Sequence, residues 1–192
     1  MEPHIFNVVR SFDRMLQDQR QAQGEATFTL NQFASSLDIG DTENLLDAPL
    51  LADIGYAANG GGTALLDSLA GPITGIDKRL KFDSAVVIIV TDGDENASQR
   101  QTWEGVAAMV VERIARGWKF ILIGANQDAK KTAARLGIPE DCALTFAPSM
   151  LGFRAAFRAA SNNLLSWRCG GLLTFTEEQQ REQRRLLNER NP

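Results

Sequence analysis

The sequence predicts an α/β fold: a doubly wound, mostly parallel sheet with helices on both faces. Two observations support this. Residues 85–90 and 120–123 form continuous apolar runs rich in β-branched side chains, which is typical of parallel strands covered on both faces. Segments with apolar residues at helical spacing alternate with such runs along the chain, and this alternation indicates βαβ units.

The N-terminal region begins with a helix. Apolar residues recur at helical spacing from Ile5 to Leu16, and residues 21–24 end the helix. Apolar and polar residues then alternate over residues 26–31, which predicts a half-buried strand. A weaker strand is expected near residues 44–47.

A glycine-rich loop at residues 59–63 precedes the next helix. The apolar face of that helix includes Leu65, Leu69 and Ile73, and Pro72 is expected to kink or shorten it. The later elements follow the same alternation: a strand at 85–90, a helix at 106–114 that ends before Gly117, a strand at 120–123, a short helix that stops at 136–139, a strand at 143–146 and a helix at 153–164.

Length and composition fit one globular domain. The chain has 192 residues, of which 44% are hydrophobic, and a chain of that size can bury a substantial core. We assign residues 1–168 to this domain and residues 169–192 to a C-terminal extension with a polar helix. Thr176 and Gln179 have the spacing of a capping box at the start of that helix.

Charge and cysteine content exclude several functional classes. The net charge is −4 and the pI is near 5.1, with both signs mixed along the chain, so we expect no nucleic-acid binding. No apolar run approaches the roughly 18 residues that span a bilayer, and the N-terminus has no signal pattern. We therefore expect a cytoplasmic protein with no membrane contact. Cys142 and Cys169 are expected to be free thiols, with a single bridge between them as the alternative.

Three loops are expected at the carboxyl ends of strands or at a helix start on the same edge: residues 59–63, 92–96 and 124–128. Ligands of doubly wound sheets bind at this edge. Asp92 follows a buried strand, and a carboxylate there loses hydration energy unless it meets a cation or several donors. Asp92 could instead cap a turn or the next helix, and Thr63 could be a helix N-cap. Residue chemistry alone leaves these alternatives open.

Four segments in order resemble the von Willebrand factor A-type family, in particular its standalone bacterial and phage-type members. They cover most of the chain up to about Arg168, and their order is more specific than any one of them. The segments are Gly24-Glu25-Ala26-Thr27-Phe28-Thr29-Leu30, Gly61-Gly62-Thr63-Ala64-Leu65-Leu66-Asp67, Val90-Thr91-Asp92-Gly93-Asp94-Glu95-Asn96-Ala97-Ser98 and Gly124-Ala125-Asn126-Gln127-Asp128-Ala129.

This resemblance implies a protein-interaction module rather than an enzyme. The family binds Mg²⁺ or Mn²⁺ at a metal-ion-dependent adhesion site built from an Asp-x-Ser-x-Ser loop, a Thr and an Asp. Thr63 matches the Thr and Asp92 matches the Asp. Hard oxygen ligands with an open position suit an octahedral divalent ion that accepts a carboxylate from a partner protein.

The resemblance also implies that the central first strand and its Asp-x-Ser-x-Ser loop are missing ahead of the first helix. Met1 stands where relatives commonly have the Met of a Ser-Gly-Ser-Met segment. We expect exposed strand edges that allow self-association. We also expect an incomplete metal site, because Thr63 and Asp92 alone are few ligands for Mg²⁺.

Two alternative functions remain. Ile88-Ile89-Val90-Thr91-Asp92-Gly93-Asp94 also resembles the start of haloacid dehalogenase-like phosphohydrolases, in which Asp92 would be the nucleophile and Asp94 the acid/base beside Mg²⁺. That motif normally opens its fold, whereas here it lies in mid-chain. The second alternative is a metal-free structural or interaction remnant. His4 is the single histidine, so histidine-based catalytic devices are not expected.

Overall fold

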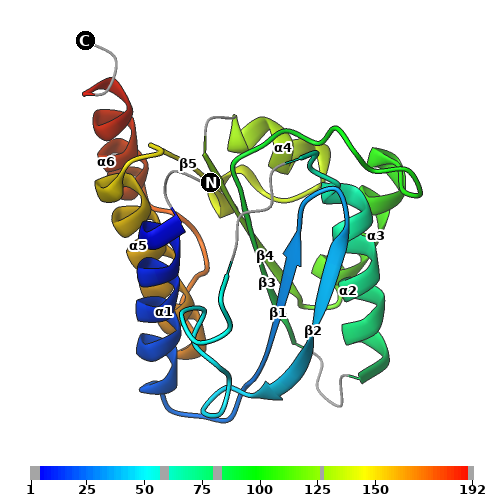
Figure 1. Ribbon diagram of the computed structural model, residues 1–192, viewed down its shortest axis with the longest axis horizontal. Helices are drawn as coiled ribbons and strands as arrows, with labels where there is room; N and C mark the ends of the chain where they lie inside the picture. The colour runs from blue at the N-terminus through cyan, green and yellow to red at the C-terminus, as the bar shows by residue number, and fades with distance from the viewer. Residues whose placement is uncertain (1–4, 57–60, 80–83, 126–127, 190–192) are drawn as a thin grey trace.

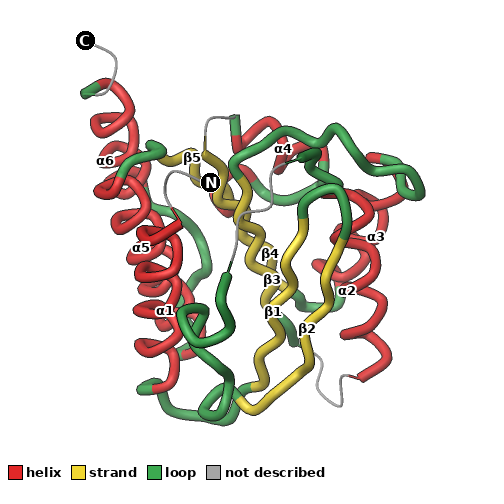
Figure 2. The backbone as a smooth tube through the Cα atoms, in the orientation of Figure 1, coloured by secondary structure: helices red, strands yellow, loops and turns green. Residues whose placement is uncertain are grey.

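The computed structural model describes residues 5–56, 61–79, 84–125 and 128–189. Two layers of helices enclose the strands, with α1, α5 and α6 on one side and α2, α3 and α4 on the other (Figures 1 and 2). Within the described residues, no helix is long and apolar enough to cross a membrane. The elements are α1 (Ile5–Arg20), β1 (Thr27–Phe33), β2 (Leu37–Asn44), α2 (Leu65–Arg79), β3 (Val86–Thr91), α3 (Trp103–Ala115), β4 (Lys119–Ala125), α4 (Ala129–Arg135), the 3₁₀ turn η2 (Glu140–Cys142), β5 (Ala143–Phe146), α5 (Met150–Arg168) and α6 (Glu177–Asn188).

The strands β3, β4 and β5 form a parallel sheet in that order, with β4 in the middle. Side chains of β4 alternate between two cores. Phe120 and Leu122 pack with α2, α3 and α4, while Ile121 and Ile123 pack with α1 and α5. This two-sided burial explains the continuous apolar sequence of β4. The predicted α/β fold with helices on both faces is confirmed.

The hairpin of β1 and β2 is a separate, antiparallel sheet. Among the described residues, strand pairing joins neither of its strands to the parallel sheet. The Val86, Ile88 and Val90 side chains of β3 are only half-buried, although their sequence suits full burial.

The predicted position of the second strand was wrong. It lies at Leu37–Asn44 rather than near residues 44–47, of which residues 45–47 form a turn. Its sequence is mostly polar because β2 is an edge strand, held by pairing with β1. Of the two effects expected of Pro72, a kink or a shortened helix, the shortening does not occur, because α2 continues to Arg79.

The helix α1 links the two sheets. Its Phe12 contacts Phe28 of the hairpin, at 6.1 Å between ring centroids, and Phe157 of α5, at 6.5 Å. The buried carboxylate of Asp13 accepts hydrogen bonds from the backbone N–H groups of Leu51 and Ala52. These contacts attach α1 to α5, to the hairpin and to the segment that follows it.

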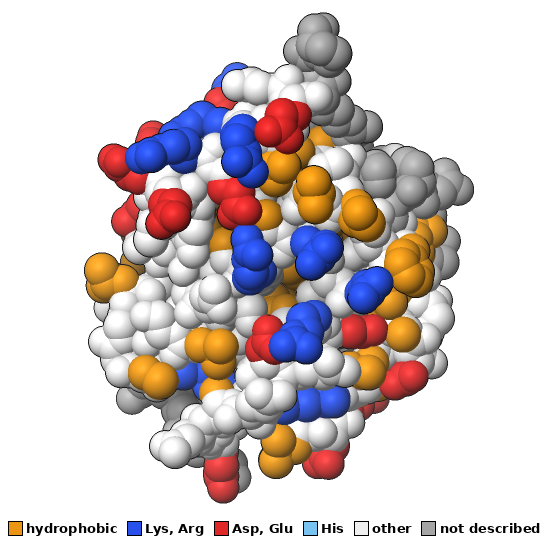
Figure 3. All heavy atoms as spheres, turned by 90° about the vertical axis from the view of Figure 1, so that its left-hand side faces the viewer, with side chains coloured by type: hydrophobic (Ala, Val, Ile, Leu, Met, Phe, Trp, Pro, Cys, Tyr) orange, Lys and Arg blue, Asp and Glu red, His pale blue; other side chains and the backbone are white. Residues whose placement is uncertain are grey.

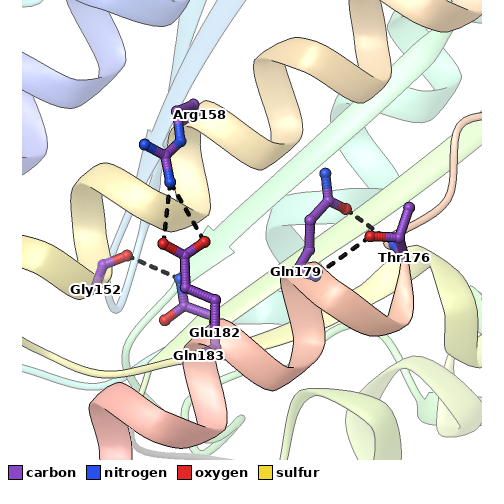
Figure 4. Close-up of polar contacts among 6 residues, drawn as sticks. All are labelled: Gly152, Arg158, Thr176, Gln179, Glu182 and Gln183. Carbon is purple, nitrogen blue, oxygen red and sulfur yellow. Dashed lines mark hydrogen bonds and ion pairs between the residues drawn. The ribbon is translucent and has the colours of Figure 1, made fainter.

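The C-terminal helix α6 packs against α5 and the end of β5 (Figure 4). The capping box of Thr176 and Gln179 is formed, as predicted. The buried Gln183 amide accepts a hydrogen bond from the Ala147 N–H and donates one to the Gly152 carbonyl. A polar sequence therefore still anchors this helix, because one amide satisfies two backbone groups.

Candidate functional site

The loop that precedes α2 and the loop that follows β3 are joined by hydrogen bonds. The backbone N–H groups of Asn96 and Ala97 donate to the Thr63 carbonyl at 3.1 and 3.3 Å. In return, the Thr63 N–H donates to the Asn96 side-chain oxygen at 2.7 Å. These bonds fix the position of Thr63 relative to the strand end that carries Asp92.

Two glycines permit this close contact. A Cβ on Gly62 would lie 2.6 Å from the Ala97 Cβ, and a Cβ on Gly93 would lie 2.6 Å from the Thr63 Oγ1. Any larger residue would therefore push the loops apart. The Thr63 hydroxyl lies against the residue next to Asp92. The prediction that Thr63 and Asp92 share one edge of the sheet is confirmed.

The carboxylate of Glu95 caps the start of α2. Its Oε2 accepts hydrogen bonds from the Leu66 N–H at 2.9 Å and the Ser98 hydroxyl at 2.7 Å. Its Oε1 accepts from the N–H groups of Ala97 and Ser98 at 3.0 and 2.8 Å. Burial alone would raise the pKa of Glu95, but these hydrogen bonds outweigh it and lower the pKa. The Glu95 carboxylate is therefore engaged within the protein, whereas the neighbouring Asp94 is exposed.

A second carboxylate, Asp67 on α2, holds the continuation of the same loop. It accepts backbone hydrogen bonds from Gln99 at 2.9 Å, Arg100 at 3.1 Å and Gln101 at 2.8 Å. The bond from Gln99 is the largest cause of a lowered Asp67 pKa, and the other two bonds and the Arg100 charge add to it. Sequence analysis missed this role, although Asp67 lies in one of the family-like segments.

These contacts bear on the interpretation of Thr63 as the N-cap of α2. The N–H groups of Leu66 and Asp67 at the start of α2 donate to Glu95 and to the Ser98 hydroxyl. The N-terminus of α2 is thus satisfied by the other loop. Its described hydrogen bonds do not use Thr63 as an N-cap, so the Thr63 hydroxyl is not committed to α2 in this way.

The third predicted loop, at residues 124–128, contributes less to the candidate site. Asp128 is the N-cap of α4 and accepts from the Lys131 N–H at 3.1 Å. Residues 126 and 127 lie outside the described residues, as do His4 and residues 57–60 of the glycine-rich loop. Cys142 and Cys169 are free thiols, as predicted, and burial raises the pKa of Cys142 to about 11.

The described donors fit a divalent ion only in part. Thr63 offers a hydroxyl and Asp92 a carboxylate, both hard oxygen ligands, at one edge of the sheet. The described part of the chain holds no group of three or more His, Cys, Asp or Glu side chains arranged to bind a metal. Glu95 and Asp67 are engaged by backbone donors. Six-fold coordination would therefore need oxygen atoms beyond those of Thr63 and Asp92.

A solved structure shares this fold. The chain resembles a von Willebrand factor type A protein from Catenulispora acidiphila with a TM-score of 0.56 at 14% sequence identity. The match covers 85% of this chain and 39% of that protein, so this chain spans well under half of its length. No protein-family model and no curated protein sequence matches the chain. The chain has a von Willebrand factor type A-like fold.

Proposed function

We propose that the chain is a protein-interaction module whose binding surface is the sheet edge where the Thr63 and Asp92 loops meet. One observation carries this proposal. Mutual hydrogen bonds and two glycine contacts hold the loops together and bring the Thr63 hydroxyl against Gly93. A pre-organised loop pair at the carboxyl end of a parallel sheet is where proteins of this architecture bind ligands.

Thr63 and Asp92 would hold Mg²⁺ or Mn²⁺ at this surface. The metal would supply a coordination position for a carboxylate of the partner protein. Because two protein ligands bind Mg²⁺ weakly, the ion would be held firmly only when further oxygen donors complete the site. The proposal is therefore a metal-assisted binding site that Thr63 and Asp92 do not complete by themselves.

The same geometry favours binding over phosphoryl transfer. A hydrolase of the haloacid dehalogenase type needs further acidic residues around Asp92 and its metal. The nearest acidic neighbours along the loop are Asp94, which is exposed, and Glu95, whose carboxylate accepts four hydrogen bonds from within the protein. Glu95 could bind a metal only by giving up those bonds. We accordingly propose no catalytic role for Asp92.

Electron paramagnetic resonance of Mn²⁺ tests the metal site directly. Free Mn²⁺ has a sharp spectrum that is lost on binding, so a titration of the wild type should show one weak site. Asp92→Asn and Thr63→Ala should weaken or abolish Mn²⁺ binding. Asp94→Asn makes the same charge change two residues away, on an exposed side chain, and should leave Mn²⁺ binding intact. Equal binding in Asp92→Asn and wild type would reject the site and favour a metal-free module.

A further inference from the structure

A cavity of about 290 Å³ lies on one face of the β1–β2 hairpin. All of its lining residues come from the hairpin and from the segment 49–54 that follows it, and none from the loops of Thr63 and Asp92. Ligand pockets of proteins begin at about 300 Å³, so this cavity suits a single side chain rather than a folded segment. We call this cavity, whose lining includes Phe28, Asp41 and Ile54, the hairpin pocket.

The register of the hairpin brings the lining side chains to one face. Phe28 lies directly opposite Glu43 on the paired strands. Side chains two residues apart on a strand share a face, so Leu30 follows Phe28 and Asp41 accompanies Glu43. A register shift between these strands adds one residue to β2, and Asp38 thereby reaches the same face. An apolar row on β1 therefore lies beside an acidic row on β2.

The opposite wall of the pocket is the segment that follows β2, which lies between α1 and the hairpin in Figure 1. Two side chains of α1 fix this segment. Asp13 accepts backbone hydrogen bonds from it, and Arg20 donates to the Ala48 carbonyl. The segment contributes Pro49 and Ile54 to the pocket. Hydrogen bonds thus hold both walls in place without a ligand, which lowers the cost of binding one.

The apolar lining is partly open to water. Phe28 and Leu30 are half-buried and pack against the core beneath the hairpin. Ile54 is 43% exposed, although it is a large aliphatic side chain. A ligand with an apolar stem would remove water from this surface, and that removal is favourable.

The carboxylates of the pocket lack cationic partners. Asp38 and Asp41 are exposed and Glu43 is half-buried, and none of the three is in an ion pair among the described residues. Elsewhere the charges are mixed: Asp18 pairs with Arg14 at 3.0 Å, and on the side of the molecule shown in Figure 3 red acidic side chains lie next to blue basic ones. The unpaired carboxylates give the pocket a negative potential that favours a cation.

We propose that the hairpin pocket binds an arginine side chain of a partner protein. The apolar stem of the arginine would lie on Phe28 and Ile54, as long basic side chains do on apolar surface. Its planar guanidinium has five N–H donors and can reach more than one carboxylate at once. A metal ion fits less well, because the described part of the chain holds no group of three or more His, Cys, Asp or Glu side chains arranged to bind one.

Nuclear magnetic resonance titration of the ¹⁵N-labelled chain tests the proposal. The ligand is a glycine–serine peptide with one arginine followed by one leucine, in buffer with EDTA so that no metal site takes part. Amide signals of residues 28–32, 38–43 and 49–54 should shift and saturate. The same peptide with citrulline, which has nearly the shape of arginine without its charge, should bind at least about tenfold more weakly.

A pair of charge variants tests the acidic row. Asp38→Asn/Asp41→Asn should bind the arginine peptide at least about fivefold more weakly than wild type. Its melting temperature should not fall, because the substitutions remove like charges that lie close together. The control Glu177→Gln/Glu178→Gln removes the same charge at exposed positions outside the pocket. It should stay within about twofold of wild type, since salt screens distant charges.

A second pair of variants tests the apolar lining. Ile54→Ser should weaken binding about threefold or more, whereas Leu172→Ser, at a more exposed apolar side chain outside the pocket, should not. Four results would overturn the proposal: no saturable shifts with the arginine peptide, equal binding of the citrulline peptide, equal losses in both charge variants, or saturation of the pocket signals by millimolar Ca²⁺ without EDTA but not by the peptide.

Discussion

Replacing Glu95 by glutamine should loosen the loop that carries Asp92. In wild type the two carboxylate oxygens accept four hydrogen bonds, three of them from backbone N–H groups. Glutamine offers one acceptor oxygen and turns an amide N–H₂ toward the remaining donors. If its oxygen keeps the bonds from Ala97 and Ser98, the Leu66 N–H faces another donor and loses its partner.

The cost follows from that single lost acceptor. A buried or half-buried donor without a partner costs about 1–3 kcal/mol, and each kcal/mol lowers the melting temperature of a domain of this size by about 2–4 °C. Taking the middle of that range, about 2 kcal/mol, we expect Glu95→Gln to lower the melting temperature by roughly 4–8 °C. Hydrogen exchange at the Leu66 and Ala97 amides should also accelerate.

The matched control is Asp94→Asn, which makes the same charge change one residue away on an exposed side chain. It should melt within about 1 °C of wild type, as most exposed substitutions do. If Glu95→Gln and Asp94→Asn melt together and exchange at the same rates, the Glu95 cap does not stabilise the loop.

Three further predictions concern the same chain. The hydrogen bonds that lower the pKa of Asp67 and Glu95 stabilise the fold at pH values above the ordinary carboxyl pKa of about 4, and this stability is lost as the pH falls through the lowered pKa values. Thermal melts from pH 6 to 3 should therefore show a falling melting temperature, and the double variant Asp67→Asn/Glu95→Gln should show a weaker pH dependence. No Mg²⁺-dependent hydrolysis of p-nitrophenyl phosphate should exceed background, and turnover that vanishes in Asp92→Asn and Asp94→Asn would support the hydrolase alternative instead. Gln183→Met should cost about 1–3 kcal/mol in urea unfolding, because the Ala147 N–H loses its acceptor and the Gly152 carbonyl loses one of its donors; an unchanged midpoint would show that α6 docks without this amide.

The strands with continuous apolar sequence could be predicted because nearly every residue of a strand covered on both faces is apolar. β4 is an example, since all its side chains after Lys119 are buried. β2 was misplaced because its residues are polar and only the partner strand β1 determines its position. Pairing across a turn is a non-local property that alternation within one segment does not report.

At the candidate site, too, residues whose contacts are distant in the sequence could not be predicted. Thr63 and Asp92 were predicted because each lies at a strand end or helix start within a family-like segment. Asp67 was missed because its partners are backbone N–H groups more than thirty residues away. The role of Glu95 as a cap of α2 was missed because the Leu66 N–H that it accepts from is likewise distant in the sequence. A weak signal existed in the Glu95-Asn96-Ala97-Ser98 segment, where a Glu precedes a Ser by three residues and accepts from it.

A Mg²⁺-dependent thermal melt tests the central claim most directly, namely that Thr63 and Asp92 form part of a metal site that needs further oxygen ligands to bind Mg²⁺ firmly. With EDTA and with millimolar Mg²⁺, the 192-residue chain should melt at nearly the same temperature and tend to self-associate. An engineered N-terminal extension that supplies an apolar strand ending in Asp-x-Ser-Gly-Ser should raise the melting temperature and make it respond to Mg²⁺, and Asp92→Ala should abolish that response. Cooperative melting of the 192-residue chain as a monomer, with clear stabilisation by Mg²⁺, would contradict the claim.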